Sequence, residues 1–141
     1  MIRRYNLEDI KQIVDIEMAT LNTTLGEEMF INNYQNPFSY CFVFEEVDIK
    51  GYISVFFDQE NLEILNFCVQ KQYQGQGIGK TLLAYILDYF KTEGAKSAVL
   101  EVRESNLRAI NLYENFGFKK IGIRKAYYSN SENALVMQKL F

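Results

Sequence analysis

The feature that most constrains this chain is a glycine-rich junction between an apolar strand and an amphipathic helix, Val69-Gln-Lys-Gln-Tyr-Gln-Gly-Gln-Gly-Ile-Gly-Lys80. Glycine allows a tight strand-to-helix turn and leaves the backbone N–H groups uncovered. The first N–H groups of a helix lack partners within the helix, and the helix dipole favours an anion beside them. The junction therefore predicts a phosphate cradle for a phosphorylated cofactor; the alternative is a tight helix-entry turn that binds nothing.

The spacing of the glycines excludes the two common phosphate-binding loops. A Walker loop has four residues between its first glycine and the Gly-Lys pair, whereas three residues separate Gly75 from Gly79, and Gln74 stands at the first glycine position. A dinucleotide-binding loop has the order G-x-G-x-x-G, which Gly75, Gly77 and Gly79 do not match. If the loop binds a phosphate group, the cofactor therefore belongs to another class.

Hydrophobic periodicity predicts a series of strands and helices. Apolar runs and alternation predict strands at residues 2–5, 40–45, 52–57, 62–69, 97–102, 118–128 and 134–140, with a turn at 47–51. Amphipathic patterns predict helices at residues 7–18, 27–34, 77–93 and 106–115. The order β-α-α-β-β-β-α-β-α-β-β predicts an α/β (α+β) fold, a mixed and mostly antiparallel sheet with helices on both faces. With 141 residues, 48% of them hydrophobic, the chain can bury a core, so we expect a single domain over residues 1–141.

Composition and charge exclude several functional classes. The net charge is −3 and no run of Lys or Arg exceeds two residues, so nucleic acid is not an expected partner. The chain starts with polar residues and has no apolar stretch near the ~18 residues of a membrane span, so we expect a soluble cytoplasmic protein without a membrane partner. Because histidine is absent, no metal site is expected, and proton transfer falls to carboxylates, tyrosines, lysines or water. Cys41 and Cys68 lie in apolar strands and are expected to be reduced and buried.

The loop pattern Gln74-x-x-Gly77-x-Gly79 resembles the Q/R-x-x-G-x-G/A pyrophosphate loop of the GCN5-related N-acetyltransferases, the GNAT superfamily. Residues 62–140 further resemble the RimI-type ribosomal-protein alanine N-acetyltransferases, through the segments 66–69, 100–106, 109–118 and 123–128. The predicted order of elements agrees with the fold of that superfamily. The resemblance implies a GNAT fold, acetyl-CoA as the cofactor, and transfer of its acetyl group to a primary amine.

The resemblance also implies which residues contact coenzyme A. In the superfamily the glycine loop grips the pyrophosphate. The strand before the loop is splayed from its parallel neighbour, and its backbone N–H groups bind the pantetheine arm and polarise the thioester. Mapped onto this chain, the cofactor-binding residues are Phe67, Cys68, Val69, Gln74, Gly75, Gln76, Gly77, Ile78, Gly79, Lys80 and Asn106.

Glu101 is the first candidate for a general base. Acetyl transfer requires a neutral amine, but an α-amino group has a pKa near ~8 and is mostly protonated at neutral pH. Glu101 stands in the otherwise apolar segment 98–102, so we expect a partly desolvated carboxylate whose pKa is raised toward neutrality. The RimI-type pattern places the base at the same glutamate, acting directly or through water. Exposure of Glu101 to solvent or its pairing with Arg103 stays open, and Glu63 is the reserve base.

Tyr113 is the candidate for a general acid. The departing thiolate needs a hydrogen bond or a proton, which a phenol can supply. Tyr113 follows Asn106 by seven residues, about two helical turns, so both are expected on one helix face and in one cleft. The RimI-type pattern makes the tyrosine the proton donor. The alternative is a purely structural Tyr113 that packs beside Phe116 and Phe118.

The acceptor is the least constrained part of the prediction. Tyr127 and Tyr128 match an aromatic pair that holds the peptide backbone in related N-terminal acetyltransferases, or they face solvent beside the turn at 129–133. Where RimI-type proteins carry a Phe-Pro-Trp-like element between their first helices, this chain has Thr23-Thr-Leu25. Three functions therefore stay open: an acetyltransferase for protein N-termini, including those of ribosomal proteins, an acetyltransferase for small amines, and a non-catalytic acyl-CoA-binding module. We expect a monomer or a weak dimer.

Overall fold

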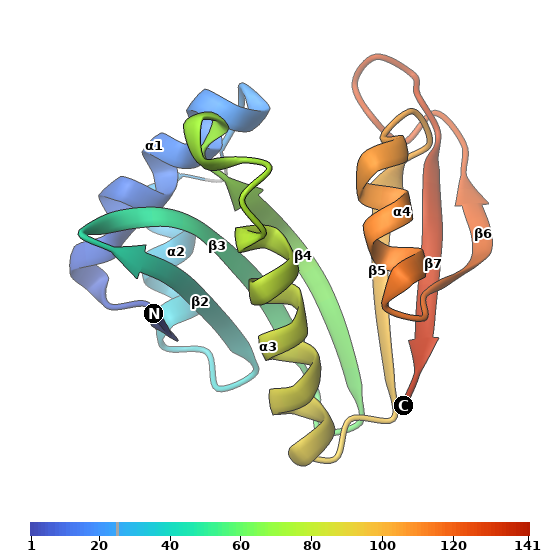
Figure 1. Ribbon diagram of the computed structural model, residues 1–141, viewed down its shortest axis with the longest axis horizontal. Helices are drawn as coiled ribbons and strands as arrows, with labels where there is room; N and C mark the ends of the chain where they lie inside the picture. The colour runs from blue at the N-terminus through green and yellow to red at the C-terminus, as the bar shows by residue number, and fades with distance from the viewer. Residues whose placement is uncertain (25) are drawn as a thin grey trace.

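The computed structural model describes residues 1–24 and 26–141, which form a seven-stranded sheet with helices on both faces (Figure 1). The strands are β1 (Ile2–Arg4), β2 (Ser39–Glu46), β3 (Asp48–Phe57), β4 (Asn61–Val69), β5 (Ser97–Arg103), β6 (Lys119–Arg124) and β7 (Ala134–Leu140). The helices are α1 (Ile10–Leu21), α2 (Glu27–Tyr34), α3 (Ile78–Thr92) and α4 (Leu107–Asn115), with the 3₁₀ turns η1 (Leu7–Asp9) and η2 (Lys71–Tyr73). The strand order is β1-β2-β3-β4-β5-β7-β6, in which β4 and β5 pair in parallel and the other neighbours pair antiparallel. The predicted fold class is confirmed.

Different helices cover the two faces of the sheet, because side chains alternate along each strand. On one face, Phe42 of β2 contacts Phe90 of α3, and Ile53 of β3 belongs to the same core. On the other face, Val43 and Tyr52 join buried residues of α1 and α2 in a second core. The parallel pair β4 and β5 lies between these two layers, and α3 is the crossover that connects its strands.

The predicted turn at 47–51 is wrong, because β3 already begins at Asp48. Ile49 is fully buried in the second core and pairs with Glu45 of β2, so packing draws this segment into the sheet. The turn shrinks to Val47, which has a left-handed φ of 68° and an exposed side chain. Burial of one isoleucine has decided the register here.

Two boundaries near the C-terminus also differ from the prediction. The predicted strand 118–128 ends at Arg124, because Ala126 has a left-handed φ of 50° and its N–H donates to Asn133 Oδ1 (2.9 Å). The predicted helix 106–115 begins at Leu107, and Asn106 is its N-cap. Both corrections move candidate site residues from regular elements into connections.

The two cysteines are buried and unpaired, as predicted. Burial raises the pKa of the Cys68 thiol to about 11, so this thiol is neutral at physiological pH. Among the helices within residues 1–24 and 26–141, none is long and apolar enough to cross a membrane.

Candidate active site

A cleft of about 780 Å³ lies where the parallel strands β4 and β5 separate. The two strands pair as far as Ile64 and Leu100, and beyond that point they diverge (Figure 1). The register of β4 against β3 shifts at the same place, because Leu65 is an extra residue in β4. A bulge of this kind bends a strand and increases its twist. The bulge thus coincides with the point at which β4 and β5 separate.

The separation leaves one backbone edge of β4 facing the cleft. The N–H of Gln70 donates to the carbonyl of Lys50 on the β3 side (2.8 Å), and hydrogen-bonding directions alternate along a strand. The N–H groups of Phe67 and Val69 therefore point away from β3 and toward the cleft. The carbonyl of Val69 points the same way and accepts from Gln74 Nε2 (3.0 Å). Such an edge can bind an extended ligand as a substitute strand and polarise a carbonyl group.

The glycine loop closes one end of this cleft. Gly75 and Gly77 have left-handed φ values of 82° and 84°, and Gly77 is the N-cap of α3. The N–H of Thr81 makes an intrahelical bond to the carbonyl of Gly77 (3.0 Å). The N–H groups of residues 78–80 precede this bond and are the unpartnered N-terminal donors of the helix. The loop thus has the backbone geometry that an anion cradle requires, and binding of a phosphate there stays a prediction.

Cations from two helices stand beside the cradle. Arg108 of α4 lines the cleft, and its Nη2 lies 4.0 Å from the position that a Cβ on Gly75 would occupy. Lys80, in the first turn of α3, also lines the cleft. Sequence reasoning missed Arg108, because nothing in the local pattern shows that the start of α4 lies against the glycine loop.

The carboxylate oxygens of Glu101, which lines the cleft from β5, have different surroundings. Oε1 accepts a hydrogen bond from Arg124 Nη1 at 2.7 Å. Oε2 is buried and has no hydrogen-bond partner among the residues that the structure describes. Arg103, the partner considered from the sequence, pairs instead with Glu132 at 3.1 Å. Glu101 therefore presents one uncommitted acceptor oxygen.

The reserve base lies elsewhere. Glu63 is an exposed residue of β4, on the stretch that is still paired with β5, and it does not line the cleft. Its carboxylate is therefore poorly placed to exchange a proton with a group in the cleft.

Tyr113 lines the cleft from α4 and is 7% exposed. Its ring centroid lies 6.5 Å from that of Phe67 on β4 and 5.8 Å from that of Phe118. Burial raises the pKa of Tyr113 above its ordinary value, so the phenol is neutral and can donate a hydrogen bond. The structural and the functional interpretation of this residue are thus compatible, because Tyr113 belongs to the buried core and also borders the cleft.

Asn106 and Tyr113 both border the cleft, although the geometry differs from the prediction. Asn106 lies outside the helix, as its N-cap, and its Oδ1 accepts from the N–H of Ala109 (3.2 Å). The capping bond orients the side chain and commits its oxygen. The NH2 group is then the part of Asn106 that can reach a ligand.

The tyrosine pair lies in the connection between β6 and β7, and each ring stacks with an arginine. The guanidinium of Arg124 is 4.2 Å from the ring centroid of Tyr127, and that of Arg103 is 4.0 Å from Tyr128. Tyr128 lines the cleft, whereas Tyr127 is 47% exposed and lies outside its lining. The structure therefore brings one of the two predicted acceptor residues to the cleft.

Three of the remaining predicted cofactor residues either have a buried side chain or lie outside the cleft lining. The side chains of Cys68 and Ile78 are buried in the two cores, so their main chains are the parts available to a ligand. Gln76 is exposed and does not line the cleft. The sequence departure at Thr23-Thr-Leu25 includes Leu25, which lies outside the described residues.

A buried glutamate that the sequence analysis missed fixes the end of α1. Glu17 is 1% exposed and accepts hydrogen bonds from the hydroxyls of Tyr52 and of Thr24, the latter at 2.7 Å. Thr20 and Leu21, the following turn of α1, line the cleft opposite β5. A buried carboxyl group with two hydroxyl donors anchors the wall of the cleft that α1 supplies. The signal in the sequence was a carboxylate next to apolar helix positions.

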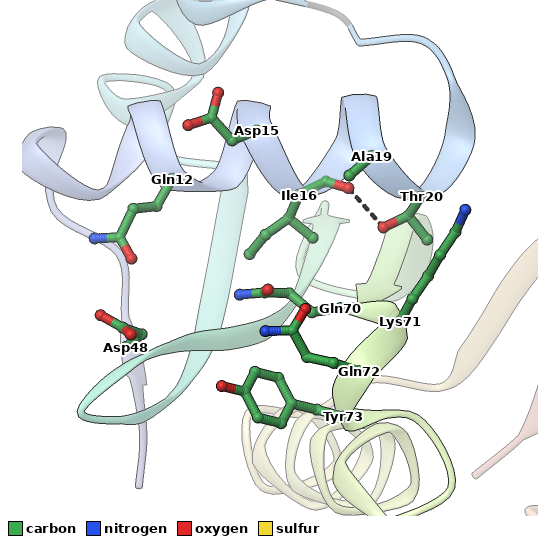
Figure 2. A pocket seen from close by; sticks show the side chains of 10 residues that line it. All are labelled: Gln12, Asp15, Ile16, Ala19, Thr20, Asp48, Gln70, Lys71, Gln72 and Tyr73. Carbon is green, nitrogen blue, oxygen red and sulfur yellow. Dashed lines mark hydrogen bonds between the residues drawn. The ribbon is translucent and has the colours of Figure 1, made fainter.

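A second cavity of about 460 Å³ adjoins the cleft between α1 and η2 (Figure 2). It shares Thr20 and Tyr73 with the cleft, and its other lining is mostly polar, as Figure 2 shows for Gln12, Asp48 and Gln72. The cavity extends the cleft along the α1 side of the sheet.

Comparison with known proteins gives a consistent result. Residues 10–118 match the model of the acetyltransferase (GNAT) family. The chain is 34% identical over 139 residues to the ribosomal protein bS18-alanine N-acetyltransferase of Haemophilus influenzae, an alignment that covers 96% of this chain and 88% of that protein. It is 31% identical over 151 residues to an N-alpha-acetyltransferase of Sulfurisphaera tokodaii, covering 96% and 90%. The crystal structure of the ribosomal-protein-S18-alanine N-acetyltransferase from Escherichia coli superposes with a TM-score of 0.92 at 28% identity, covering 99% of this chain and 92% of that one.

Proposed function

Because the chain belongs to the acetyltransferase (GNAT) family and is an acetyl-CoA-dependent N-acetyltransferase, we propose that its acceptor is the N-terminal α-amino group of a protein. Both relatives, similar over 96% of the chain, carry names that specify this kind of acceptor, alanine of ribosomal protein bS18 in one case. The structural observation that supports the chemistry is that Glu101, whose buried Oε2 has no hydrogen-bond partner among the described residues, lines the same cleft as Tyr113.

The residues around the cleft fit acetyl-CoA. The N–H groups of residues 78–80 and the guanidinium of Arg108 suit a pyrophosphate, and the edge N–H groups of Phe67 and Val69 suit an amide-containing arm. When bound, acetyl-CoA supplies the acetyl group as an activated thioester.

Glu101 prepares the acceptor in this proposal. An α-amino group enters mostly as the ammonium ion at neutral pH, because its pKa lies near ~8. Oε2 of Glu101 accepts the proton, directly or through a water molecule, while Oε1 stays bound to Arg124. The amine that results is neutral and can attack a carbonyl carbon.

The opposite side of the cleft stabilises the charges that develop during transfer. The N–H groups of Phe67 and Val69 are oriented to hold negative charge on the carbonyl oxygen. Tyr113, kept neutral by burial, donates its hydroxyl proton or a hydrogen bond to the departing sulfur. Its ring contact with Phe67 keeps donor and edge amides in one fixed arrangement.

The acceptor chain lies, in this proposal, between the end of α1 and the β6–β7 connection. Thr20 and Leu21 line the cleft from one side and Tyr128 from the other. Glu17 anchors the first wall, and the Arg103–Glu132 pair anchors the second. Both walls are held by side-chain hydrogen bonds, so the space between them is preformed.

The test is a transfer assay with a peptide panel. The protein is incubated with acetyl-CoA and short peptides that differ in their first residue, and product is identified by mass spectrometry beside thiol release. A matched peptide with a blocked N-terminus and one internal lysine separates α-amine from side-chain transfer. We expect turnover on free N-termini, alanine among them, and none on the blocked peptide. Turnover confined to polyamines, amino acids or other small amines would overturn the proposal, and so would coenzyme A binding without any turnover.

The glycine cradle gives a separate prediction. We expect Gly77→Ala to raise the KM for acetyl-CoA by about tenfold, equivalent to about 1.4 kcal/mol, because a Cβ disfavours the left-handed φ of 84° and tilts the N–H groups of the cradle. Gly26→Ala is the control at another glycine N-cap, since Gly26 precedes α2, lies outside the cleft lining, and has nothing within 4 Å of an added Cβ. Its backbone (φ 86°, ψ 162°) is essentially restricted to glycine, so this variant should lose more thermal stability than Gly77→Ala, whose φ of 84° and ψ of 8° lie in the left-handed helical region. An equal rise in the acetyl-CoA KM for both would contradict the role of the cradle.

A further inference from the structure

Arg124 reaches Glu101 across an intervening strand. The order β5-β7-β6 puts β7 between them, and adjacent strands lie about 4.8 Å apart. Val136 of β7 is the partner of both Glu101 and Gly122, so Arg124, two residues beyond Gly122, projects from the same face as Glu101. Ala134 of β7 is the partner of Arg124, and its small side chain leaves room for the arginine to cross β7 toward Glu101.

The arginine is itself held on its far side. Its guanidinium stacks on the ring of Tyr127 at 4.2 Å from the centroid while Nη1 donates to Glu101 Oε1 at 2.7 Å. Stacking and a directed hydrogen bond together restrict the planar group more than either contact alone. The β6–β7 connection thereby fixes the rotation of the Glu101 carboxylate.

The ion pair divides the carboxylate into an anchored and a free oxygen. Oε1 is bound, and Oε2 is buried without a partner among the described residues. The Arg124 side chain is 53% exposed, and exposed ion pairs contribute little to folding stability. The Arg124–Glu101 pair is therefore expected to add little to the folding stability. Its direct effect is to fix the orientation of Oε2.

We propose that Arg124 is a positioning residue for the acceptor amine: it anchors Glu101 Oε1 so that Oε2 faces the incoming amino group. This inference rests on the proposed function, because it assumes that Glu101 receives a proton from the acceptor. It also implies that the acceptor ammonium engages Oε2 and leaves the Arg124 pair intact.

The experiment compares Arg124→Gln and Arg124→Lys with the control Lys120→Gln. The control removes the charge of an exposed lysine on the same strand, β6. Arg124→Gln should lower kcat about 10²-fold, the size of effect expected when a catalytic group is misplaced by about 1 Å. Its KM for acetyl-CoA and its thermal midpoint should stay near those of the parent. Arg124→Lys should recover part of the rate, because lysine supplies the charge without the planar fork. Lys120→Gln should match the parent.

A double-mutant cycle tests whether Arg124 acts through Glu101. In the Glu101→Gln background, Arg124→Gln should cause no further loss of kcat, because the group that it positions is already gone. An independent, multiplicative loss in the double variant would overturn the inference while leaving the proposed function in place. Absence of α-amine transfer by the parent protein would refute the proposed function and this role of Arg124 with it.

Discussion

Glu101→Gln should lower kcat for a free peptide N-terminus by about 10²- to 10⁴-fold, the range associated with general acid–base catalysis. Glutamine keeps the size of the side chain and can still accept a hydrogen bond from Arg124, but its amide cannot take up a proton. The loss corresponds to about 3 to 5 kcal/mol of activation free energy. The measurement is steady-state turnover of acetyl-CoA with a peptide acceptor at saturating concentrations of both.

The effect of Glu101→Gln on the rate should depend on pH. An α-amino group loses its proton in solution above its pKa near ~8, so at higher pH the acceptor arrives neutral and needs a base less. The ratio of parent to variant rate should therefore shrink as the pH rises from about 7 to about 9. A ratio that stays constant over this range would show that Glu101 does not act by removing the proton from the ammonium ion.

Glu63→Gln is the matched control for this experiment. Glu63 is the same residue type on the neighbouring strand, is exposed, and lies outside the cleft lining. We expect its kcat to equal that of the parent. The opposite outcome, a loss in Glu63→Gln with an active Glu101→Gln, would move the base to β4.

Tyr113→Phe should lower kcat by about 10²-fold with little change in the KM for acetyl-CoA. The ring is retained, so the contacts with Phe67 and Phe118 and the folding stability should be preserved, while the hydroxyl that serves the departing sulfur is removed. Tyr85→Phe is the control, because Tyr85 is a partly exposed tyrosine of α3 outside the cleft lining. A Tyr113→Phe variant with the parent kcat would leave this residue a structural role alone.

The protonation state of Tyr113 determines the pH range over which it can act as a proton donor. Burial raises the pKa of its phenol above the ordinary value near ~10, so the donating form is present throughout the neutral range and is lost only when the pH rises above that raised value. Titration of Tyr113 should therefore cause no fall in rate between about pH 7 and pH 10. An alkaline fall within that range that disappears in Tyr113→Phe would contradict the raised pKa, while still showing that the Tyr113 hydroxyl takes part in the reaction.

The conformation of the glycine loop could be predicted from local sequence. The left-handed φ of Gly75 and Gly77 and the start of α3 at Ile78 depend on a few consecutive residues, and the spacing alone separated this loop from other phosphate loops. The order of strands and helices was predictable for the same reason, since hydrophobic periodicity is a property of short windows.

Other predictions failed where packing between distant segments outweighed a local signal. The turn at 47–51 reads as polar and glycine-containing, yet burial of Ile49 places that segment in β3. The spacing of Asn106 and Tyr113 suggested a shared helix face, yet Asn106 caps the helix from outside and joins the cleft by another route.

By itself the sequence determined the turn at the glycine loop, the succession of elements and the choice of Glu101 and Tyr113 as candidates, because turn preferences, hydrophobic periodicity and residue chemistry act over short distances. The tertiary structure alone decided that Glu101 pairs with Arg124, which is 23 residues away, and not with Arg103. It also decided that Leu65 bulges and separates β4 from β5. These outcomes depend on strand register, and register is set by the simultaneous burial of residues far apart in the chain.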